Sequence, residues 1–246
     1  MPEQLFDRAA EYEAMLNQGI GLSGEGQEYF IFGRVQDMRS QIPSRPGRIL
    51  DFGCGTGKAT AYLSEVFPGA EVVGADLSAD ALQHAKMHFG SDRVSFVSIP
   101  ELPKFERFDL CYVNGVFHHI LPDERQQTLV MIRNLLKPGT HLALFENNPW
   151  NPGTRMVMRR IPFDRDAIPL SYLETRRRVK AAGFRIYGTR FLFYMPKSLS
   201  PLRFIEPLLV NVPLGAQYYV LAGIPASCAV SCRGTSSWKR TPRRQA

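Results

Sequence analysis

The sequence predicts an α/β protein with a doubly wound, mostly parallel sheet of seven strands and a helical cap at its N-terminus. Two observations favour this class. Short apolar segments alternate with amphipathic helical segments, an order that places parallel strands between two layers of helices. The first apolar segment, 48–52, leads into glycines at every second position (Gly53, Gly55 and Gly57), which predicts a tight turn into a helix.

The three glycines also indicate a binding site. Glycine is favoured where the backbone adopts a positive φ angle or lies close to a ligand. The turn should therefore form a shelf of backbone N–H groups, suited to a nucleoside-like ligand with a polar or anionic tail. A dinucleotide site would follow the pattern G-x-G-x-x-G, but Lys58 occupies the position of its third glycine. The spacing therefore disfavours an NAD-dependent oxidoreductase.

Two helices are predicted ahead of the first strand. Apolar residues recur at helical spacing over 2–18, and a second helical segment runs from about Gln27 to Ser40. The glycine-rich segment 19–26 separates the two helices. We assign residues 1–45 to this N-terminal cap and residues 46–224 to the main domain.

The remaining elements alternate and are bounded by capping or turn residues, such as Ser78, the capping box of Ser171 and Glu174, and Gly183. The segment 147–160 is expected to be a loop or helical. We expect helices at 57–66, 78–89, 122–136 and 172–182, and strands at 71–76, 94–98, 108–113, 141–146, 184–194 and 217–222.

Three motifs, in this order, resemble the class I S-adenosylmethionine-dependent methyltransferases. Asp51-x-Gly53-x-Gly55-x-Gly57 is similar to motif I of that family. The second strand ends in Asp76, as the second strand of the family ends in an acid, and 108–119 looks like the fourth strand and the loop after it. The resemblance covers residues 45–195 and implies a Rossmann-like methyltransferase fold whose last strand is antiparallel.

The resemblance also implies S-adenosyl-L-methionine as the cofactor. The glycine turn would cradle the methionyl and ribose part, Asp76 would accept the ribose hydroxyls, and Leu77 would pack on the adenine. Asp51 would order the turn or meet the amino group. The cofactor residues that the resemblance implies are Asp51, Gly53, Cys54, Gly55, Gly57, Asp76, Leu77, Ser98, Ile99, Asn114 and Gly115.

One part of this set departs from the family pattern. The segment after the third strand often supplies an Asp to the adenine amino group, whereas this chain has Ser98-Ile99-Pro100-Glu101. Ser98 or a backbone group would have to replace that contact. After the fourth strand, Asn114 and Gly115 would border the methionine end of the cofactor.

Methyl transfer from a sulfonium needs no metal, but an oxygen or nitrogen nucleophile can need a base. His118 and His119 follow the fourth strand at the carboxyl end of the sheet, where ligands bind in open α/β folds. A histidine with a pKa near ~6.5 can remove a proton at neutral pH. Successive side chains point in different directions, so we expect one of the two to face the site. A purely structural role is the alternative.

Contacts to the acceptor are predicted from two places. Glu146 and Asn147 follow the fifth strand, and they are also secondary candidates for the base. The resemblance implies that Tyr29, Phe30 and Arg34 of the cap line the site and that the glycines of 19–26 act as a lid hinge. The alternative for the cap aromatics is that they only pack their helix against the main domain.

The charge is unevenly placed along the chain. Residues 1–152 contain 13 Lys and Arg against 19 Asp and Glu, while residues 153–246 contain 17 against 4. Two interpretations stay open: a solvated face with a basic disordered tail over 225–246, or attraction to an anionic substrate, a lipid surface or nucleic acid. The four cysteines show no metal-site or disulfide spacing, so we expect reduced thiols.

The predicted location is the cytoplasm. The chain contains no apolar run of about 18 residues, the length that suggests a membrane-spanning helix. Its N-terminus lacks the basic-then-apolar layout of a signal peptide.

The sequence thus predicts an S-adenosylmethionine-dependent methyltransferase that modifies a small-molecule, lipid or saccharide acceptor at oxygen. The alternative is a cofactor-binding or interaction module without turnover. DNA adenine methylation is disfavoured, because such enzymes carry an Asn/Asp-Pro-Pro-aromatic motif where this chain has Asn114-Gly115-Val116-Phe117.

Overall fold

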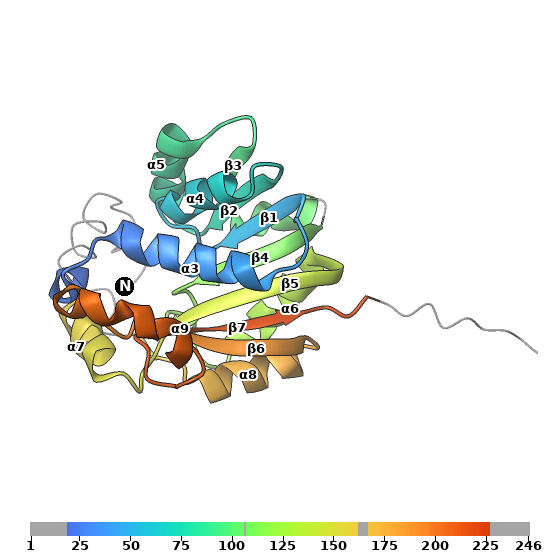
Figure 1. The fold of residues 1–246 in the computed structure, drawn as a ribbon. Helices are drawn as coiled ribbons and strands as arrows, with labels where there is room; N and C mark the ends of the chain where they lie inside the picture. The colour runs from blue at the N-terminus through green and yellow to red at the C-terminus, as the bar shows by residue number, and fades with distance from the viewer. Residues whose placement is uncertain (1–18, 106, 162–166, 227–246) are drawn as a thin grey trace, which may run out of the picture.

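The computed structural model describes residues 19–105, 107–161 and 167–226, which form one seven-stranded sheet in the order β3-β2-β1-β4-β5-β7-β6 (Figure 1). Strands β1 to β5 are parallel, and β7 runs antiparallel to both β5 and β6. This confirms the predicted mostly parallel sheet and its antiparallel last strand. The strands are β1 (Arg48–Phe52), β2 (Glu71–Asp76), β3 (Val94–Ser98), β4 (Phe108–Asn114), β5 (Leu136–Asn147), β6 (Arg185–Leu192) and β7 (Gln217–Gly223).

Helices cover both faces of the sheet. Side chains alternate across each strand, so Ile49 and Leu50 of β1 enter different hydrophobic clusters. The cluster around Ile49 includes α3 and α4, and the cluster around Leu50 includes α6 and α8. The helices are α3 (Gln27–Gln41), α4 (Lys58–Val66), α5 (Ala79–Phe89), α6 (Arg125–Leu135), α7 (Pro152–Arg160), α8 (Tyr172–Ala181) and α9 (Glu206–Leu209), with 3-10 helices η1 (Gly21–Ser23), η2 (Ile99–Lys104) and η4 (Lys197–Ile205).

The helix α3 is part of the main hydrophobic core. Its residues Val35 and Met38 are fully buried and share a cluster with Ile49 and Tyr112 of the sheet. The second helix of the predicted cap therefore packs directly on the sheet. The first predicted cap helix, 2–18, lies outside the described residues, as does the tail from residue 227 onward, and the domain boundaries stay predictions.

Two element boundaries differ from the sequence prediction by more than two residues. Helix α6 begins at Arg125 instead of residue 122, because the preceding residues form a turn in which the Glu124 N–H donates to the Leu121 carbonyl. Strand β5 begins at Leu136 instead of residue 141, because Leu136 already pairs with Phe108 across a local irregularity. Pro138 and Gly139, which suggested the end of a helix, lie inside this strand.

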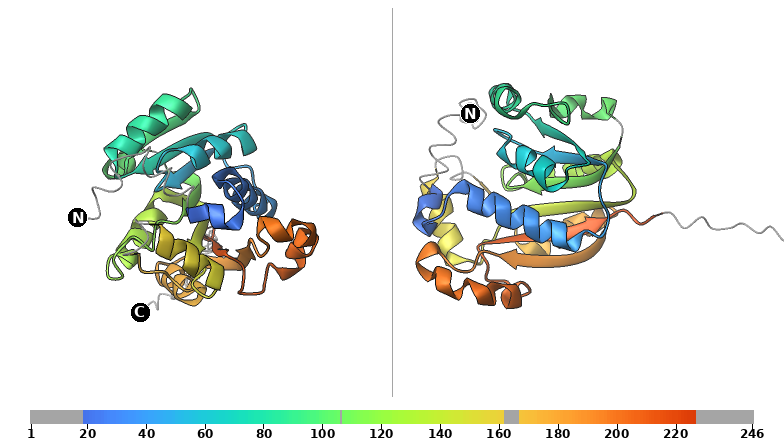
Figure 2. Two further views of the ribbon diagram at one scale, coloured as in Figure 1. Left: turned by 90° about the vertical axis from the view of Figure 1, so that its left-hand side faces the viewer. Right: turned by 45° about the horizontal axis from the view of Figure 1, so that its top comes forward.

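The segment 193–216, which connects β6 to β7, has helical structure that the sequence analysis did not predict. It contains η4 and α9, and neither helix has a buried residue. We call this segment the insertion. Figures 1 and 2 show the insertion, η1 and α7 gathered at one end of the molecule. Within the described residues, none of the helices is both long and apolar enough to cross a membrane.

Candidate active site

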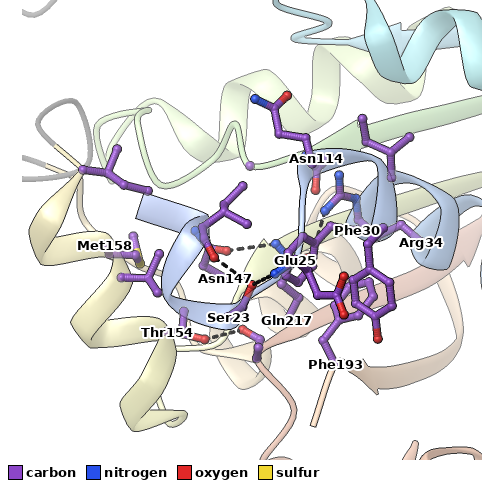
Figure 3. A pocket seen from close by; sticks show the side chains of 18 of the residues that line it. Ser23, Glu25, Phe30, Arg34, Asn114, Asn147, Thr154, Met158, Phe193 and Gln217 are labelled. Carbon is purple, nitrogen blue, oxygen red and sulfur yellow. Dashed lines mark hydrogen bonds between the residues drawn. The ribbon is translucent and has the colours of Figure 1, made fainter. Parts of the chain in front are cut away.

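A cavity of about 470 Å³ lies at the carboxyl ends of β1, β4 and β5. Its walls come from the glycine turn after β1, the loop after β4, η1 with the start of α3, α7, and the first residues of the insertion. Figure 3 shows side chains from these separate segments facing the same space. This is the position at which open α/β sheets bind their ligands.

The glycine turn has the backbone that the spacing predicts, with φ of +76° at Gly53, +52° at Gly55 and +86° at Gly57. A Cβ on Gly53 would lie 2.3 Å from Val116, and a Cβ on Gly57 would lie 2.8 Å from Ala85. Among the described residues, a Cβ on Gly55 would meet nothing within 4 Å. Gly53 and Gly57 are therefore required by packing, whereas Gly55 leaves open space where the turn lines the cavity.

Asp76 holds the glycine turn in place. Its Oδ2 accepts a hydrogen bond from the Gly55 N–H at 2.8 Å, and its Oδ1 accepts one from the Ser78 N–H at 3.0 Å. The Ser78 side chain in turn caps α5, as predicted. Asp76 thus links the end of β2 to the shelf beside β1, and its remaining lone pairs are suited to ribose hydroxyls.

Asp51 is a buried carboxylate at the base of the cavity. Its Oδ2 accepts a hydrogen bond of 2.7 Å from the Thr60 hydroxyl. Burial, with a smaller contribution from the charge of Asp76, raises its pKa to about 7, while the Thr60 hydrogen bond and Arg34 oppose this rise. A cation placed at this carboxylate would relieve the cost of its ionisation.

His118 and Glu146 form a close polar pair at the cavity. His118 Nδ1 lies 2.6 Å from Glu146 Oε2, and both side chains are buried. Glu146 Oε1 accepts a second hydrogen bond, of 2.7 Å, from the Phe117 N–H. The loop after β4 is further held by the Ile168 N–H, which donates to the His118 carbonyl at 2.8 Å. Of the two histidines, His118 is the buried one, whereas His119 is exposed, and both line the cavity.

Arg34 crosses from α3 to the sheet beneath the cavity. It is 6% exposed, and its Nε donates to the Tyr112 hydroxyl and its Nη1 to Gln217 Oε1, each at 3.0 Å. The Gln217 side-chain amide in turn donates a hydrogen bond to Asn147 Oδ1 at 3.1 Å. Figure 3 shows this line of contacts from Arg34 through Gln217 to Asn147. A buried guanidinium bonded to two neutral groups is available to an anionic group of a ligand.

Aromatic rings form the wall beside the insertion. Phe30 and Phe193 have ring centroids 4.9 Å apart, and Tyr29 lies 5.6 Å from Phe193. Phe193 has a φ of +62°, and its ring occupies the space that a Cβ on Gly33 would take. Tyr29 also stacks with the guanidinium of Arg203 at 4.5 Å. The wall is therefore built from α3 and the insertion together.

Most of the residues singled out in the sequence meet at this cavity. Leu77 is 75% exposed next to it, and Glu146 lies beneath His118 instead of in the lining. Gly57, Asp76, Ser98 and Ile99 lie at the carboxyl ends of β1 to β3 but outside the lining. The predicted residues that do line the cavity are Tyr29, Phe30, Arg34, Asp51, Gly53, Cys54, Gly55, Asn114, Gly115, His118, His119 and Asn147.

Other lining residues were not predicted. They come from the segment around η1, from α7 and the residue after it, from the insertion and from the start of β7, and none of these places carries a recognisable sequence motif. The only available signal was the apolar spacing within 154–161. The main additions are Ile20, Ser23, Glu25, Thr154, Met156, Met158, Ile161, Phe193, Met195, Pro196 and Gln217.

Comparisons with known proteins agree with this fold. Residues 50–142 match the family model described as a methyltransferase domain. A trans-aconitate 2-methyltransferase from Deinococcus radiodurans is 38% identical over 112 residues, which cover 45% of this chain and 42% of that protein. A malonyl-[acyl-carrier protein] O-methyltransferase from Halalkalibacterium halodurans is 27% identical over 144 residues, covering 56% of this chain and 52% of that protein.

A solved structure covers more of the chain. It comes from Thermotoga maritima, is described as an S-adenosylmethionine-dependent methyltransferase and possible histamine N-methyltransferase, and has a TM-score of 0.66 at 19% identity. The match covers 91% of this chain and 99% of that one. The matches to the curated relatives span about half of those proteins.

Residues 50–142 thus match a methyltransferase domain, and the fold is that of a solved S-adenosylmethionine-dependent methyltransferase. S-adenosylmethionine is the cofactor of such enzymes, and the residues present fit it. The turn at Gly55 leaves room for a ligand against the backbone, Asp76 offers carboxylate oxygens beside it, and Asp51 offers a buried negative charge for an ammonium group.

Proposed function

We propose that this protein transfers a methyl group from S-adenosylmethionine to a hydroxyl oxygen of a small acceptor, with His118 as the general base. The observation that carries the proposal is the 2.6 Å contact between His118 Nδ1 and Glu146 Oε2 at the wall of the cavity. Histidine supported by a buried carboxylate is a common arrangement for proton removal at neutral pH.

The hydrogen bond fixes which nitrogen of His118 can act. An ionised carboxylate only accepts hydrogen bonds, so Nδ1 carries the proton in the neutral ring and Nε2 is the basic nitrogen. When Nε2 takes the acceptor's proton, the ring becomes a cation, and Glu146 stabilises that cation. Glu146 also fixes the loop through the Phe117 N–H, so the ring has little freedom to turn away.

The cofactor half of the site is proposed at the glycine turn. Gly53, Gly55 and Cys54 would lie along the methionyl and ribose part, Asp76 would accept the ribose hydroxyls, and Asp51 would face the ammonium group. S-adenosylmethionine supplies a methyl group already activated by a positive sulfur, so the protein's remaining task is to position and deprotonate the acceptor.

The presence of a base favours a hydroxyl acceptor over a carboxylate. Carboxylic acids have pKa values near ~4 and are already ionised at neutral pH, so they gain nothing from proton removal. A phenol, with a pKa near ~10, is almost fully protonated at pH 7 and gains much. The supported histidine is therefore most useful with a neutral hydroxyl.

A carboxylate acceptor is the second candidate, and Arg34 favours it. Its buried guanidinium lines the cavity and is suited to hold an anion. The names of two relatives, a trans-aconitate and a malonyl-[acyl-carrier protein] methyltransferase, refer to carboxylic acid compounds. In this case Arg34 would bind the acceptor and His118 would have no role in proton transfer.

Release of S-adenosylhomocysteine, measured with matched small phenols, alcohols and carboxylic acids, tests the proposal. We expect turnover of hydroxyl compounds and a loss of at least about 100-fold in kcat for His118→Gln, with a smaller loss for His119→Gln. Turnover of carboxylic acids that survives His118→Gln but not Arg34→Gln would favour the second candidate. Cofactor binding without turnover of any class would favour a binding module.

A further inference from the structure

We propose that the end of the molecule formed by α7 and the insertion docks on an anionic phospholipid surface. Apolar side chains of the insertion would enter the boundary between headgroups and acyl chains, and arginines of α7 would contact the phosphates. The inference concerns binding only, and it does not depend on the proposed methyl transfer.

The insertion exposes an unusual number of apolar side chains. Neither η4 nor α9 has a buried residue, and Phe204 and Leu208 are 77% and 80% exposed. Single exposed apolar residues are normal on a protein surface, but a group of them on one short segment marks an interaction site. The group consists of Leu199, Leu202, Phe204, Leu208, Val212 and Leu214.

The helix α7 presents positive charge next to this group. Arg155, Arg159 and Arg160 are exposed, and together with Pro152 and Met156 they line an open groove. Helix α7 and Ile161, the residue after it, contain no acidic side chain. Glu206 is the one acidic residue of the insertion, which the structure describes in full. Guanidinium groups in such a groove suit phosphate oxygens, which they bind in a bidentate manner.

The two parts are in direct contact. The Thr154 hydroxyl of α7 donates to the Ala216 carbonyl at 2.7 Å, and the Asn151 amide donates to the Leu214 carbonyl at 2.7 Å. All three views of the fold show α7, η4 and α9 at the same end of the molecule (Figures 1 and 2). Both parts also line the cavity, through Met156 and Pro196. The surface therefore lies beside the active site.

The positive charge of this surface favours an anionic lipid surface over a second copy of the chain as its partner. In a symmetric dimer this surface meets a second copy of itself, so the arginines of α7 would find Glu206 as the one acid of the insertion. Burying the arginines with so little opposite charge opposes association. An anionic bilayer supplies both phosphates for the arginines and an apolar layer for Phe204 and Leu208, which is the pattern of proteins that lie on a membrane surface.

Sedimentation of the full chain with vesicles tests the inference, using phosphatidylcholine with and without phosphatidylglycerol and no cofactor or acceptor. We expect binding to the anionic vesicles. Vesicle binding should fall at least about tenfold in the double variant Phe204→Glu/Leu208→Glu. It should fall by a similar factor in the triple variant Arg155→Glu/Arg159→Glu/Arg160→Glu. The matched controls change other exposed residues: Met87→Glu/Val130→Glu for the apolar pair and Arg177→Glu/Lys180→Glu/Arg185→Glu for the charges. Both controls should bind as the unchanged protein does.

Two outcomes would overturn the inference. Equal binding by all variants would mean that charge elsewhere in the chain, such as the basic residues after position 226, attracts the vesicles. No vesicle binding, together with a dimer in light scattering that only the two patch variants disrupt, would assign the surface to a second copy of the chain. Circular dichroism of each variant separates these outcomes from loss of folding.

Discussion

Glu146 Oε2 lies 2.6 Å from His118 Nδ1, and this contact joins the end of β5 to the loop after β4. The two strands are neighbours in the sheet, and the pairing of Asn114 with Phe145 places the residues that follow at the same height. Phe117, fully buried, anchors the loop between them. The sheet register thus sets the orientation of the proposed base.

Replacing Glu146 by Gln should lower kcat far more than it changes KM. The amide oxygen can still accept from the Phe117 N–H, but the amide nitrogen would face Nδ1 and force the proton of the neutral ring onto Nε2. We expect a loss of about 10²–10⁴ in kcat, the range of general base catalysis. Steady-state kinetics over a pH series measure it. Unchanged kcat, with the fold intact by circular dichroism, would refute the role of the pair.

Replacing Asp51 by Asn should stabilise the protein in the absence of ligand. Burial raises the pKa of Asp51 to about 7 in the folded protein, so folding favours the protonated carboxyl. The resulting contribution to the free energy of unfolding is complete below pH ~4 and is lost as the pH rises through about 7. The rise from 3.8 corresponds to at most about 4 kcal/mol. The amide oxygen can keep the Thr60 hydrogen bond, so we expect a gain of about 2–4 kcal/mol at pH 8.

Urea unfolding at pH 8 and pH 5 measures this gain, which should shrink by at least about half at the lower pH. The same variant should bind S-adenosylmethionine more weakly, because it lacks the negative charge proposed for the ammonium group. A stability difference that does not change with pH would mean that the carboxyl ionises normally in the folded protein.

The glycines of the turn should differ in what they tolerate. Gly53→Ala places a Cβ against Val116 at 2.3 Å, and we expect it to cost about 2–3 kcal/mol. Gly55→Ala meets no atom of the described residues within 4 Å, so we expect only its positive φ to cost energy, about 1–2 kcal/mol. Urea unfolding compares the two variants. A greater loss for Gly55→Ala would contradict the described turn.

Arg125→Met should destabilise the protein and disturb the loop that carries His118. The buried guanidinium donates to the carbonyls of Ile120 and Ile168, and Ile168 donates to the His118 carbonyl. Two carbonyls would lose their donors, and we expect a cost of about 2–4 kcal/mol.

Arg133→Met, on the same helix, is the matched control for Arg125→Met. Arg133 Nε is buried without a hydrogen-bond partner, so its removal should cost little. Chemical unfolding measures both changes. A similar loss in the two variants would show that the hydrogen bonds of Arg125 do not hold this loop.

The sequence predicted the parts of the site that lie in short local patterns. The glycine spacing after β1 was enough to predict the tight turn, and the acid at the end of β2 was enough to predict the position of Asp76. Both features depend mainly on neighbouring residues in the sequence. Glu146 was assigned to the acceptor, whereas the structure places it beneath His118. That contact depends on the register of β4 and β5, which no local pattern encodes.

The insertion was missed for a different reason. Its helices bury no residue, so the segment carries no periodic apolar stripe of a packed helix. The positive φ of Phe193 and the contact of its ring with Gly33 also depend on the tertiary fold. Accordingly, the wall formed by α3 and the insertion appeared only in the structure.

Binding of S-adenosylmethionine at the glycine turn beside His118 underlies every role proposed for this site. Calorimetric titration of the unchanged protein and of Gly55→Arg measures this binding, with NAD as the comparison ligand. We expect one site for S-adenosylmethionine, no binding of NAD, and a loss of at least about 100-fold in affinity in a folded Gly55→Arg protein, whose side chain would occupy the space left open at the turn. Equal affinity in that variant, or binding of NAD alone, would contradict binding of S-adenosylmethionine there.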